Sequence, residues 1–375
     1  MKAVRFHGQH DLRYEDIPVP TLKQGQVKIK PAWVGICGSD LHEYLGGPGL
    51  CPTTPHPITG ETVPLTFGHE FSGTIEEVGE GVDDWVVGDR VSVQPIIYDG
   101  TCGACQDNLH NCCWSNGFIG LSGWGGGLSE HIVVPTSALY RLPKNVPLQI
   151  GALVEPLSVG WHAVKASPFK KGDAVLILGS GPIGIAVMLA LQAKGADKII
   201  ISEVSRKRQE YAKNFGAHHI LDPTKDDVVK RCRELCDGQG VDVVFDCAGV
   251  QVALDAAIEA TRARGTIVNV AIWEKPCTIT PNLFTFKERR YMGVATFQVG
   301  DFQEVIVSTV FQIAEEKLQP PIDGRTDAIS AGSMKPERMI TGRIELDEVE
   351  EKGFKTLIND KDNQVKILVK VGGDD

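Results

Sequence analysis

The spacing of apolar residues changes along the chain. In residues 1–150, short runs alternate apolar and polar side chains, as in QVKIK at 26–30 and GTIEEV at 73–78. Turn-forming glycines, such as GEG at 79–81, follow these runs. A period of two is typical of short antiparallel strands with one buried face. We therefore expect a β-rich first part.

From residue 173 onward, short apolar runs alternate with segments of helical length. The predicted strands are 174–178, 198–202, 241–246 and 266–270, and the predicted helices are 183–194, 206–215 and 252–262. Ser205 is expected to cap the second helix and Gly216 to end it. Strands that are apolar on both faces and separated by helices indicate a parallel sheet covered on both sides.

The C-terminal part mixes both patterns. We predict a helix at 302–317, a break at Pro320 and Pro321, a helix near 346–358 and a final strand at 365–369. The whole chain is therefore predicted to have an α/β fold.

Length and charge limit the function. At 375 residues the chain exceeds the usual size of one domain, so we expect two. A formal charge of −10, spread along the chain, argues against nucleic acid and anionic membranes as partners. No apolar stretch approaches the roughly 20 residues of a membrane-spanning helix, and the first residues lack a signal-peptide pattern. We expect a cytoplasmic protein that binds small molecules.

Ten cysteines without a secretory signal indicate metal ligands and small buried side chains rather than disulfides. Cys232 and Cys236 face the same way on a predicted helix. No histidine or second cysteine pair accompanies them, so packing is favoured over metal binding.

A glycine-rich turn follows the first strand of the predicted parallel sheet. It fits the dinucleotide pattern GxGxxG, and its expected binding residues are Gly179, Gly181, Pro182, Ile183 and Gly184. The glycines allow a tight turn, a close approach to the pyrophosphate and close packing of the helix on the sheet. The helix N-terminus attracts phosphate.

Glu203 ends the second predicted strand, where a carboxylate can accept hydrogen bonds from ribose hydroxyls. A carboxylate repels a 2′-phosphate, so NAD is favoured over NADP, although Arg206 and Arg208 are candidates to soften that preference. The alternative is that Glu203 is a solvated residue at a strand end.

Cys37 and His69 offer the thiolate and imidazole that zinc prefers. Glu155, near the boundary between the two patterns, offers a third ligand and leaves the fourth position open. Zinc beside a nicotinamide suggests alcohol oxidation, because the metal lowers the pKa of an alcohol oxygen. The alternative for Cys37 is a buried structural thiol.

Four stretches of the chain resemble the medium-chain zinc-dependent alcohol dehydrogenases, and within that family the polyol branch. They are CGSDLHEYL at 37–45, GHE at 68–70, LVEPLSVGWHAV at 153–164 and MITGRI at 339–344. The resemblance extends over the whole chain. It implies a β-rich, GroES-like catalytic domain at 1–157, a Rossmann NAD-binding domain at 158–300, and a segment at 301–375 that returns to the catalytic domain.

The resemblance also implies roles for named residues. Cys37, His69 and Glu155 are expected to hold the catalytic zinc, with Glu70 as an alternative ligand or a partner of the ligands. A proton relay is expected on Ser39 and His42, since a hydroxyl both donates and accepts and an imidazole titrates near neutral pH. The alternative for His42 is a surface imidazole.

Members of this family also carry a structural zinc on four cysteines with the spacing C-x2-C-x2-C-x7-C. The corresponding residues are Asp99, Cys102, Cys105 and Cys113. Asp99 replaces the first cysteine, and a carboxylate can complete a tetrahedral site. Cys112 is one residue out of register and is expected to be a spare thiol. The alternative is a metal-free lobe with reduced thiols.

The resemblance favours an NAD- and zinc-dependent dehydrogenase that interconverts vicinal diols with hydroxyketones, and hydroxyketones with diketones. Glutamate at the third ligand position points to secondary alcohols, because primary-alcohol members usually carry cysteine there. A sorbitol or xylitol dehydrogenase and a catalytically silent nucleotide-binding protein are the alternatives. By analogy we expect a homodimer or homotetramer. Candidate pocket residues are Tyr44, Trp114, Phe118, Ile119 and Trp273.

Overall fold

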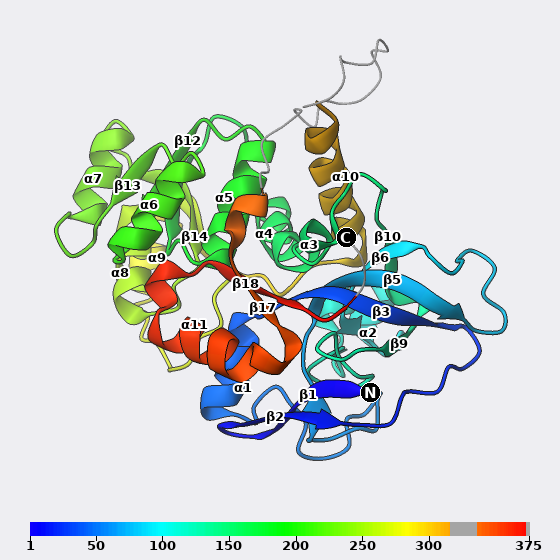
Figure 1. Cartoon of the computed structure of the whole chain (residues 1–375). Helices are drawn as coiled ribbons and strands as arrows, with labels where there is room; N and C mark the ends of the chain where they lie inside the picture. The colour runs from blue at the N-terminus through cyan, green and yellow to red at the C-terminus, as the bar shows by residue number, and fades with distance from the viewer. Residues whose placement is uncertain (316–335, 373–375) are drawn as a thin grey trace, which may run out of the picture. The chain divides into compact units, whose positions relative to one another are not determined.

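The computed structural model describes residues 1–315 and 336–372 (Figure 1). The predicted break at Pro320 and Pro321, and the end of the helix expected at 302–317, lie outside the described residues.

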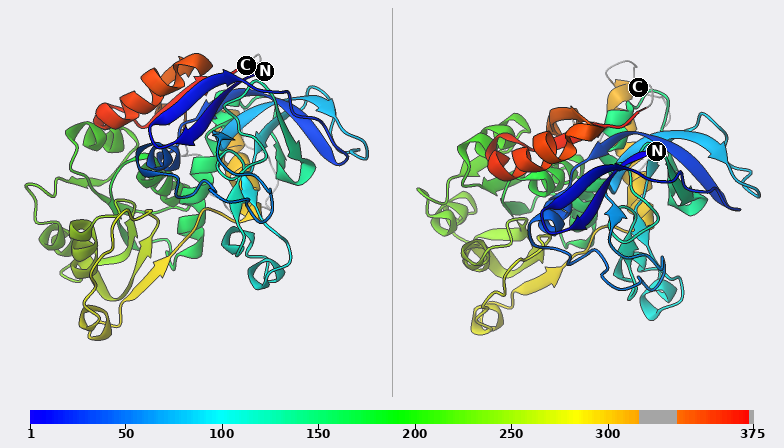
Figure 2. Two further views of the ribbon diagram at one scale, coloured as in Figure 1. Left: turned by 90° about the horizontal axis from the view of Figure 1, so that it is seen from below. Right: turned by 60° about the horizontal axis from the view of Figure 1, so that its bottom comes forward.

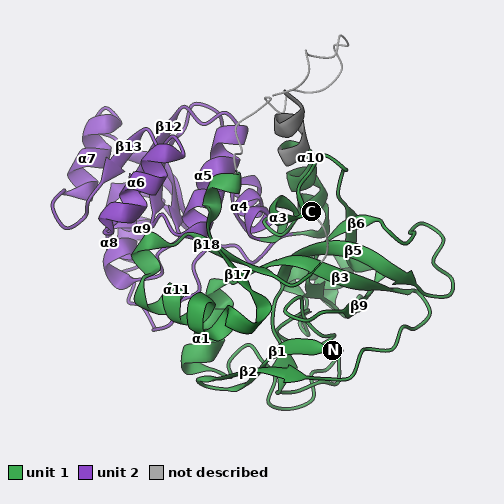
Figure 3. Ribbon diagram, in the orientation of Figure 1, with its two compact units in different colours: residues 1–155, 298–310, 336–375 green, residues 156–297, 311–335 purple. Residues whose placement is uncertain are grey.

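The contacts divide the chain into two compact units (Figure 3). Unit 1 comprises residues 1–155, 298–310 and 336–375, and unit 2 comprises residues 156–297 and 311–335. Unit 1 thus contains segments from the beginning and the end of the chain.

Unit 1 is built mainly from antiparallel strands. Its seven-stranded sheet has the order β10-β6-β5-β3-β18-β17, with β9 also paired to β3 (Figures 1 and 2). A second sheet has the order β2-β1-β4, and β7 pairs with β8. The strands are β1 (Lys2–Gly8), β2 (Asp11–Asp16), β3 (Gln26–Gly35), β4 (Leu65–Thr66), β5 (Glu70–Val78), β6 (Arg90–Val93), β7 (Ile96–Ile97), β8 (Gly117–Phe118), β9 (Ile132–Pro135), β10 (Leu139–Arg141), β17 (Ile340–Glu345) and β18 (Lys366–Lys370).

Aromatic side chains fill the interior of unit 1. Phe6 of β1 stacks on Phe67, with ring centroids 4.9 Å apart, and Phe71 of β5 is fully buried beside them in the same cluster. In the first half of β3, buried Val27 and Ile29 alternate with less buried lysines, as the period-two pattern predicts, whereas the first four residues of β5 are all buried.

Short helices connect the strands of unit 1. They are α1 (Gly38–Gly46), α2 (Gly103–Gln106), α3 (Leu148–Gly151), α11 (Lys355–Asn359), and the 3₁₀ turns His110–Cys112, Thr136–Ala138, Pro336–Met339, Leu346–Glu348 and Lys361–Asn363. Two longer helices, α4 (Val154–Ala166) and α10 (Val299–Glu315), cross the unit boundaries.

The helix predicted at 346–358 is not a single α-helix. A 3₁₀ turn at Leu346–Glu348 leads into a π-helical segment at Val349–Phe354, and α11 follows. Gly353 lies in the π-helical segment, where an added Cβ would come within 2.5 Å of the side chain of Ile36. Close packing on a neighbouring loop therefore accompanies the departure from regular α-helix.

Unit 2 has the parallel sheet that its apolar strands predict. The strand order is β13-β12-β11-β14-β15-β16, and every pairing in it is parallel. This confirms the predicted α/β fold with a Rossmann-type sheet. The strands are β11 (Ala174–Leu178), β12 (Lys198–Ser202), β13 (His219–Leu221), β14 (Val241–Asp246), β15 (Thr261–Asn269) and β16 (Arg290–Gly293). The helices are α5 (Pro182–Ala193), α6 (Arg206–Asn214), α7 (Val228–Leu235), α8 (Gln251–Ala260) and α9 (Asn282–Thr285).

Two element ends in unit 2 differ from the predicted ones. Helix α8 ends at Ala260 and β15 begins at Thr261, although the helix was expected to reach residue 262 and the strand to begin at 266. The hydroxyl of Thr261 donates to the carbonyl of Ala257, and the register against β14 shifts between Val241 and Val243. The strand therefore begins with an irregular segment, and the spacing of apolar residues in the sequence does not predict it.

Cys232 and Cys236 pack in the apolar cluster of unit 2, which confirms their interpretation as packing residues. None of the helices in the described part of the chain has the length and apolar character needed to cross a membrane.

We expect Phe245→Ala to destabilise unit 2 strongly. Phe245 is fully buried in β14, and truncating a buried phenylalanine costs about 3–5 kcal/mol, which lowers Tm by about 10 °C. Calorimetry measures the shift. The control is Phe286→Ala, whose side chain is 77% exposed and whose loss should leave Tm nearly unchanged. Equal shifts in both variants would contradict the burial argument.

Candidate functional site

Two neighbouring strand ends in unit 1 bring Cys37 and His69 together. β3 ends at Gly35, β5 begins at Glu70, and the antiparallel register pairs these two residues directly. Cys37 follows the first strand end and His69 precedes the second. Ligand atoms of Cys37, His69 and Glu70 all lie within 4.8 Å of one another. The register of one strand pair therefore assembles a group with a thiol, an imidazole and a carboxylate.

Asp40 belongs to this group, although it was not predicted as a site residue. It is fully buried in the first turn of α1. Its Oδ2 accepts the backbone N–H of Cys37 at 2.9 Å, and its Oδ1 lies 3.4 Å from Nδ1 of His69. Burial acts to lower the pKa of His69, but Asp40 and then Cys37 raise it well above its usual value. A carboxylate behind a histidine commonly orients a metal-ligating ring.

The sequence signal for Asp40 is its position. It lies three residues after Cys37, which occupies the N-cap of α1, so its side chain can return to the backbone N–H of that residue.

Lys366 is a second site residue that sequence reasoning missed. It is the first residue of β18 and is 2% exposed. Its Nζ donates to both carboxylate oxygens of Glu70 at 2.7 Å and to the carbonyl of Ile36 at 3.2 Å. The available signal was a lysine directly before the apolar run ILV at 367–369.

Glu155 lies in the first turn of α4 and is 5% exposed. Burial, with the nearby carboxylates of Glu70 and Asp40, raises its pKa to about 8, although His69 and Lys366 act in the opposite direction. Glu155 is therefore close enough to interact electrostatically with the group. It is not among the described side chains whose ligand atoms lie within 4.8 Å of each other, so its direct ligation remains a prediction.

The donor set fits a divalent cation. Asp40, Glu70 and Glu155 are all buried, and Lys366 is the only buried lysine in residues 1–315 and 336–372. Glu70 is paired with Lys366 and Asp40 lies beside His69, and buried carboxyl groups are otherwise stable when they are neutral or coordinate a metal. A cysteine and a histidine select zinc over harder cations. The residues present therefore fit zinc.

The predicted relay residues lie one turn apart on α1. Cys37, His69 and Glu70 are called the metal group below. Ser39 lies near it, with its Oγ 3.3 Å from Nε2 of His69. His42 is half-buried. Residues three apart on a helix share a face, so the fold gives these two side chains a common direction.

The second predicted metal group is also assembled. Ligand atoms of Asp99, Cys102, Cys105 and Cys113 lie within 4.8 Å of one another. Asp99 Oδ1 accepts the backbone N–H groups of Thr101 at 2.6 Å and Cys102 at 2.8 Å, and these bonds lower the pKa of Asp99 well below its usual value. Its side chain is thus held in its charged form.

Cys112 is exposed and lies outside this group, as expected of a spare thiol.

The glycine-rich turn lies between β11 and α5 in unit 2. Gly179 has φ +88°, a conformation that favours glycine. An added Cβ at Gly184 would lie 2.0 Å from the carbonyl oxygen of Gly179, so a side chain there is excluded. Gly181 is the N-cap of α5 and Pro182 is its first residue. The turn thus has the geometry that the predicted phosphate site requires.

Glu203 supports this turn from the end of β12. Its Oε2 accepts the backbone N–H of Ser180 at 2.7 Å and the Ser180 hydroxyl at 3.1 Å, and its Oε1 accepts the N–H of Ser205 at 2.8 Å. A carboxylate has about four acceptor positions, so one remains for a ribose hydroxyl. Glu203 is 5% exposed, which excludes the solvated alternative.

Arg208 lies on α6, and its Nη1 is 3.5 Å from the position that a Cβ on Gly181 would occupy. The guanidinium therefore lies over the phosphate end of the turn. Arg206, by contrast, points into solvent, with its side chain 92% exposed.

Most of the residues predicted to line a substrate pocket lie elsewhere, in the core of unit 1, on the surface or in unit 2. Tyr44 and Ile119 are buried in the core of unit 1, and the Tyr44 hydroxyl donates to Glu350 at 2.9 Å. Trp114 is 81% exposed, whereas Trp273 donates to Asn269 in unit 2.

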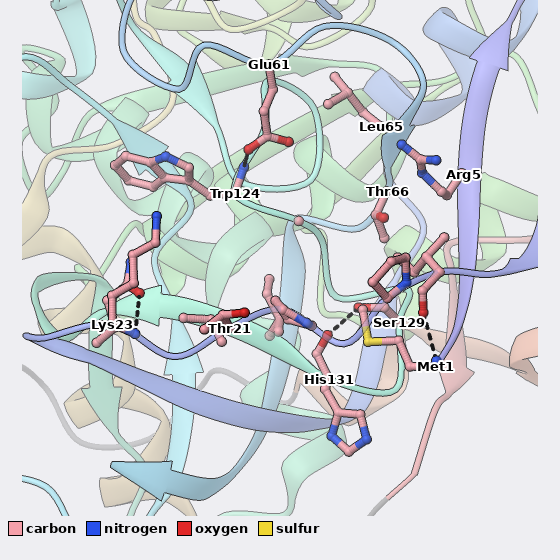
Figure 4. A pocket seen from close by; sticks show the side chains of 17 residues that line it. Met1, Arg5, Thr21, Lys23, Glu61, Leu65, Thr66, Trp124, Ser129 and His131 are labelled. Carbon is pink, nitrogen blue, oxygen red and sulfur yellow. Dashed lines mark hydrogen bonds between the residues drawn. The ribbon is translucent and has the colours of Figure 1, made fainter. Parts of the chain in front are cut away.

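A surface cavity of about 380 Å³ in unit 1 is separate from these groups (Figure 4). None of the predicted site residues lines it. Three of its basic groups have partners in the protein: the amine of Met1 donates to the carbonyl of Ile17 at 2.8 Å, Arg5 pairs with Glu15 at 3.3 Å, and His131 contacts Glu76 at 2.7 Å.

We expect Asp99→Ala to lower the zinc content toward one ion per chain, because it removes one donor of four. Asp99→Cys should keep the zinc and make it more resistant to chelators, since thiolate is the softer ligand. Metal analysis before and after chelator treatment measures both effects. Cys112→Ser is the matched control and should change neither. Full zinc retention in Asp99→Ala would remove Asp99 from the ligand set.

Comparison with known families and proteins agrees with the predicted family and fold. Residues 23–144 match the alcohol dehydrogenase GroES-like domain, and residues 182–310 match the zinc-binding dehydrogenase family. The first match contains Cys37, His69 and Glu70, and the second begins at helix α5, which follows the glycine turn.

Two relatives match almost the whole chain. The (R,R)-butanediol dehydrogenase of Bacillus subtilis is 44% identical over 99% of this chain and 99% of its own, and that of Neisseria gonorrhoeae is 41% identical over 98% and 99%. The crystal structure of 2R,3R-butanediol dehydrogenase from Bacillus subtilis covers 98% of this chain and 99% of its own with a TM-score of 0.87. The chain therefore belongs to the zinc-dependent alcohol dehydrogenase family.

Proposed function

We propose that this protein interconverts (R,R)-2,3-butanediol and acetoin with NAD, and that it also reduces diacetyl to acetoin. Similarity to (R,R)-butanediol dehydrogenases over nearly the full length carries this substrate assignment. A glutamate rather than a cysteine at position 155 supports it, since the family resemblance associates that residue with secondary alcohols and polyols.

Cys37, His69 and Glu155 are proposed to hold the catalytic zinc, with Glu70 as the alternative ligand. When bound, zinc supplies a Lewis acid that lowers the pKa of an alcohol, and NAD supplies the hydride acceptor. Asp40 orients the imidazole of His69 through the charge beside Nδ1. Burial of His69, Glu70 and Glu155 lowers their contact with water and strengthens their electrostatic interactions.

Ser39 and His42 are proposed to remove the proton of the substrate hydroxyl. The Ser39 hydroxyl can accept that proton while it donates its own, and the His42 imidazole can deliver a proton to solvent near neutral pH. The position of Ser39 beside His69 supports its role as the first member of the relay.

The nucleotide is proposed to bind unit 2. The contact residues are Gly179, Gly181, Pro182, Ile183, Gly184, Glu203 and Arg208. The turn and the N-terminus of α5 suit a pyrophosphate, and Glu203 suits the ribose hydroxyls of NAD. In functional terms we assign residues 1–157 to the catalytic domain, 158–300 to the NAD-binding domain and 301–375 to a segment that returns to the catalytic domain.

A structural zinc is proposed on Asp99, Cys102, Cys105 and Cys113. The spacing of these residues and the charged state of Asp99 support it. We further propose that the protein works in the cytoplasm as a homodimer or homotetramer. All ten cysteines are unpaired, which suits a reducing compartment.

A sorbitol or xylitol dehydrogenase remains the second candidate, because it shares every catalytic residue named above. Only the substrate pocket distinguishes the two. A catalytically silent protein would be expected to have lost a ligand or a relay residue, and the sequence retains them all.

Initial rates with NAD test the substrate assignment. We expect (R,R)-2,3-butanediol to have the highest kcat/KM, above its meso and (S,S) isomers, sorbitol and ethanol. Removal of zinc by a chelator should abolish activity, and added zinc should restore it. Sorbitol oxidised faster than every butanediol isomer would overturn the assignment and favour the polyol candidate.

We expect Glu203→Ala to raise the KM for NAD by about 10- to 100-fold, since a hydrogen bond to a charged group contributes about 1.5–3 kcal/mol. Steady-state kinetics measures the change, and zinc content should be unaltered. Glu210→Ala is the control, because Glu210 lies on α6 with its side chain 56% exposed. Unchanged NAD kinetics in Glu203→Ala would contradict its ribose assignment.

A further inference from the structure

Ser180 lies in the middle of the glycine-rich turn, between Gly179 and Gly181, and is fully buried. Its backbone N–H donates to Oε2 of Glu203 at 2.7 Å, and its hydroxyl donates to the same oxygen at 3.1 Å. The backbone N–H of Ser205 donates to the other oxygen, Oε1, at 2.8 Å. Within the described part of the chain, these three donors hold one carboxylate, and the Ser180 hydroxyl is the one that a side chain supplies.

The hydroxyl of Ser180 has a second acceptor within reach. The carbonyl oxygen of Arg208, in α6, lies 3.2 Å away. The carboxylate of Glu203 is the stronger of the two acceptors because it is charged. Burial removes competing water, so the hydroxyl joins the turn to the carboxylate and stabilises it in one orientation.

The backbone of Glu203 is also held by hydrogen bonds. Its N–H donates to the carbonyl of Leu221 at 3.0 Å, and its carbonyl accepts from Nε2 of Gln209 at 2.7 Å. The end of β12 is therefore fixed on both sides. A ligand that does not suit this carboxylate has to be accommodated by rotation of the Glu203 side chain.

NAD and NADP make different demands on the carboxylate. A ribose hydroxyl of NAD can donate to the acceptor position that the three protein donors leave on Oε1. NADP carries a phosphate in place of the 2′-hydroxyl, so the carboxylate has to turn away from it. That rotation breaks hydrogen bonds between Glu203 and the protein. The cost of binding NADP therefore includes these bonds in addition to the repulsion between two negative charges.

We propose that Ser180 is a positioning residue that sets the preference for NAD over NADP by fixing the carboxylate of Glu203. This rests on the proposed ribose contact of Glu203 but not on the identity of the alcohol. The charge of Glu203 repels a 2′-phosphate, and the Ser180 hydroxyl keeps that charge in place. The other two donors are backbone groups, so the hydroxyl is the part of this arrangement that a conservative substitution removes.

The test measures the dissociation constants of NADH and NADPH by fluorescence titration of the zinc-containing protein. The proteins compared are Ser180→Ala, Glu203→Ala, the double variant Ser180→Ala/Glu203→Ala and the unaltered protein. Selectivity is the dissociation constant of NADPH divided by that of NADH. No alcohol or ketone is present, so the outcome is independent of the butanediol assignment.

Ser180→Ala should lower the selectivity about tenfold, because one hydrogen bond to a charged group no longer opposes rotation of the carboxylate. Most of the change should come from tighter binding of NADPH, since two donors still hold Glu203 for NADH. Glu203→Ala should lower the selectivity further. The double variant should match Glu203→Ala, because the hydroxyl then has no carboxylate to hold.

Ser205→Ala is the matched control. It removes a hydroxyl that accepts from the backbone N–H of Arg208 at 3.4 Å and caps α6, but it keeps the backbone N–H that donates to Glu203. It should lower Tm and leave the selectivity unchanged. A general loosening of the turn weakens NADH and NADPH equally, so the selectivity separates positioning of the carboxylate from a purely structural effect.

Unchanged or increased selectivity in Ser180→Ala would overturn the proposal. A double variant less selective than Glu203→Ala, or an equal loss of selectivity in Ser205→Ala, would do the same. Unchanged selectivity in Glu203→Ala would reject the ribose contact itself, and the role of Ser180 with it.

Discussion

Antiparallel pairing of β3 with β5 on one side and with β18 on the other places Gly35 opposite both Glu70 and Leu368. A slip of one residue in either pairing would turn the neighbouring side chains to the opposite face of the sheet. The metal group depends on this register, because Cys37 follows one paired strand end and His69 precedes the other. Gly35 is required in the middle, where a side chain would occupy the position of the Glu70 carboxylate.

Buried charge is the second constraint on the metal group. Asp40, Glu70 and Glu155 are carboxyl groups with little or no exposure to water, and their surroundings differ. Glu70 is paired with an ammonium, Asp40 lies behind an imidazole, and Glu155 has a pKa of about 8 because burial dominates. Environment rather than residue type therefore separates their roles. A divalent cation bound to this group would add positive charge beside these carboxyl groups.

The nucleotide turn of unit 2 depends on local interactions. Gly184 lies close to the carbonyl of Gly179, five residues earlier, and Pro182 begins the helix that follows the turn. Glu203 adds a longer-range restraint, since it joins the turn to the start of α6 through Ser180 and Ser205. One carboxylate therefore has a structural role as well as the proposed role in ribose binding.

The sequence by itself determined the features that depend on neighbouring residues: the strand and helix patterns of the two parts, the glycine turn and the Ser205 cap. These are encoded by periods and spacings of a few residues. Only the tertiary structure decided that Lys366 pairs with Glu70, 296 positions away, and that Asp40 lies beside His69. It also decided which apolar candidates, such as Tyr44, belong to the core. The physical reason is that strand register and burial, which place these groups, arise from contacts between distant segments and leave no periodic mark in the sequence.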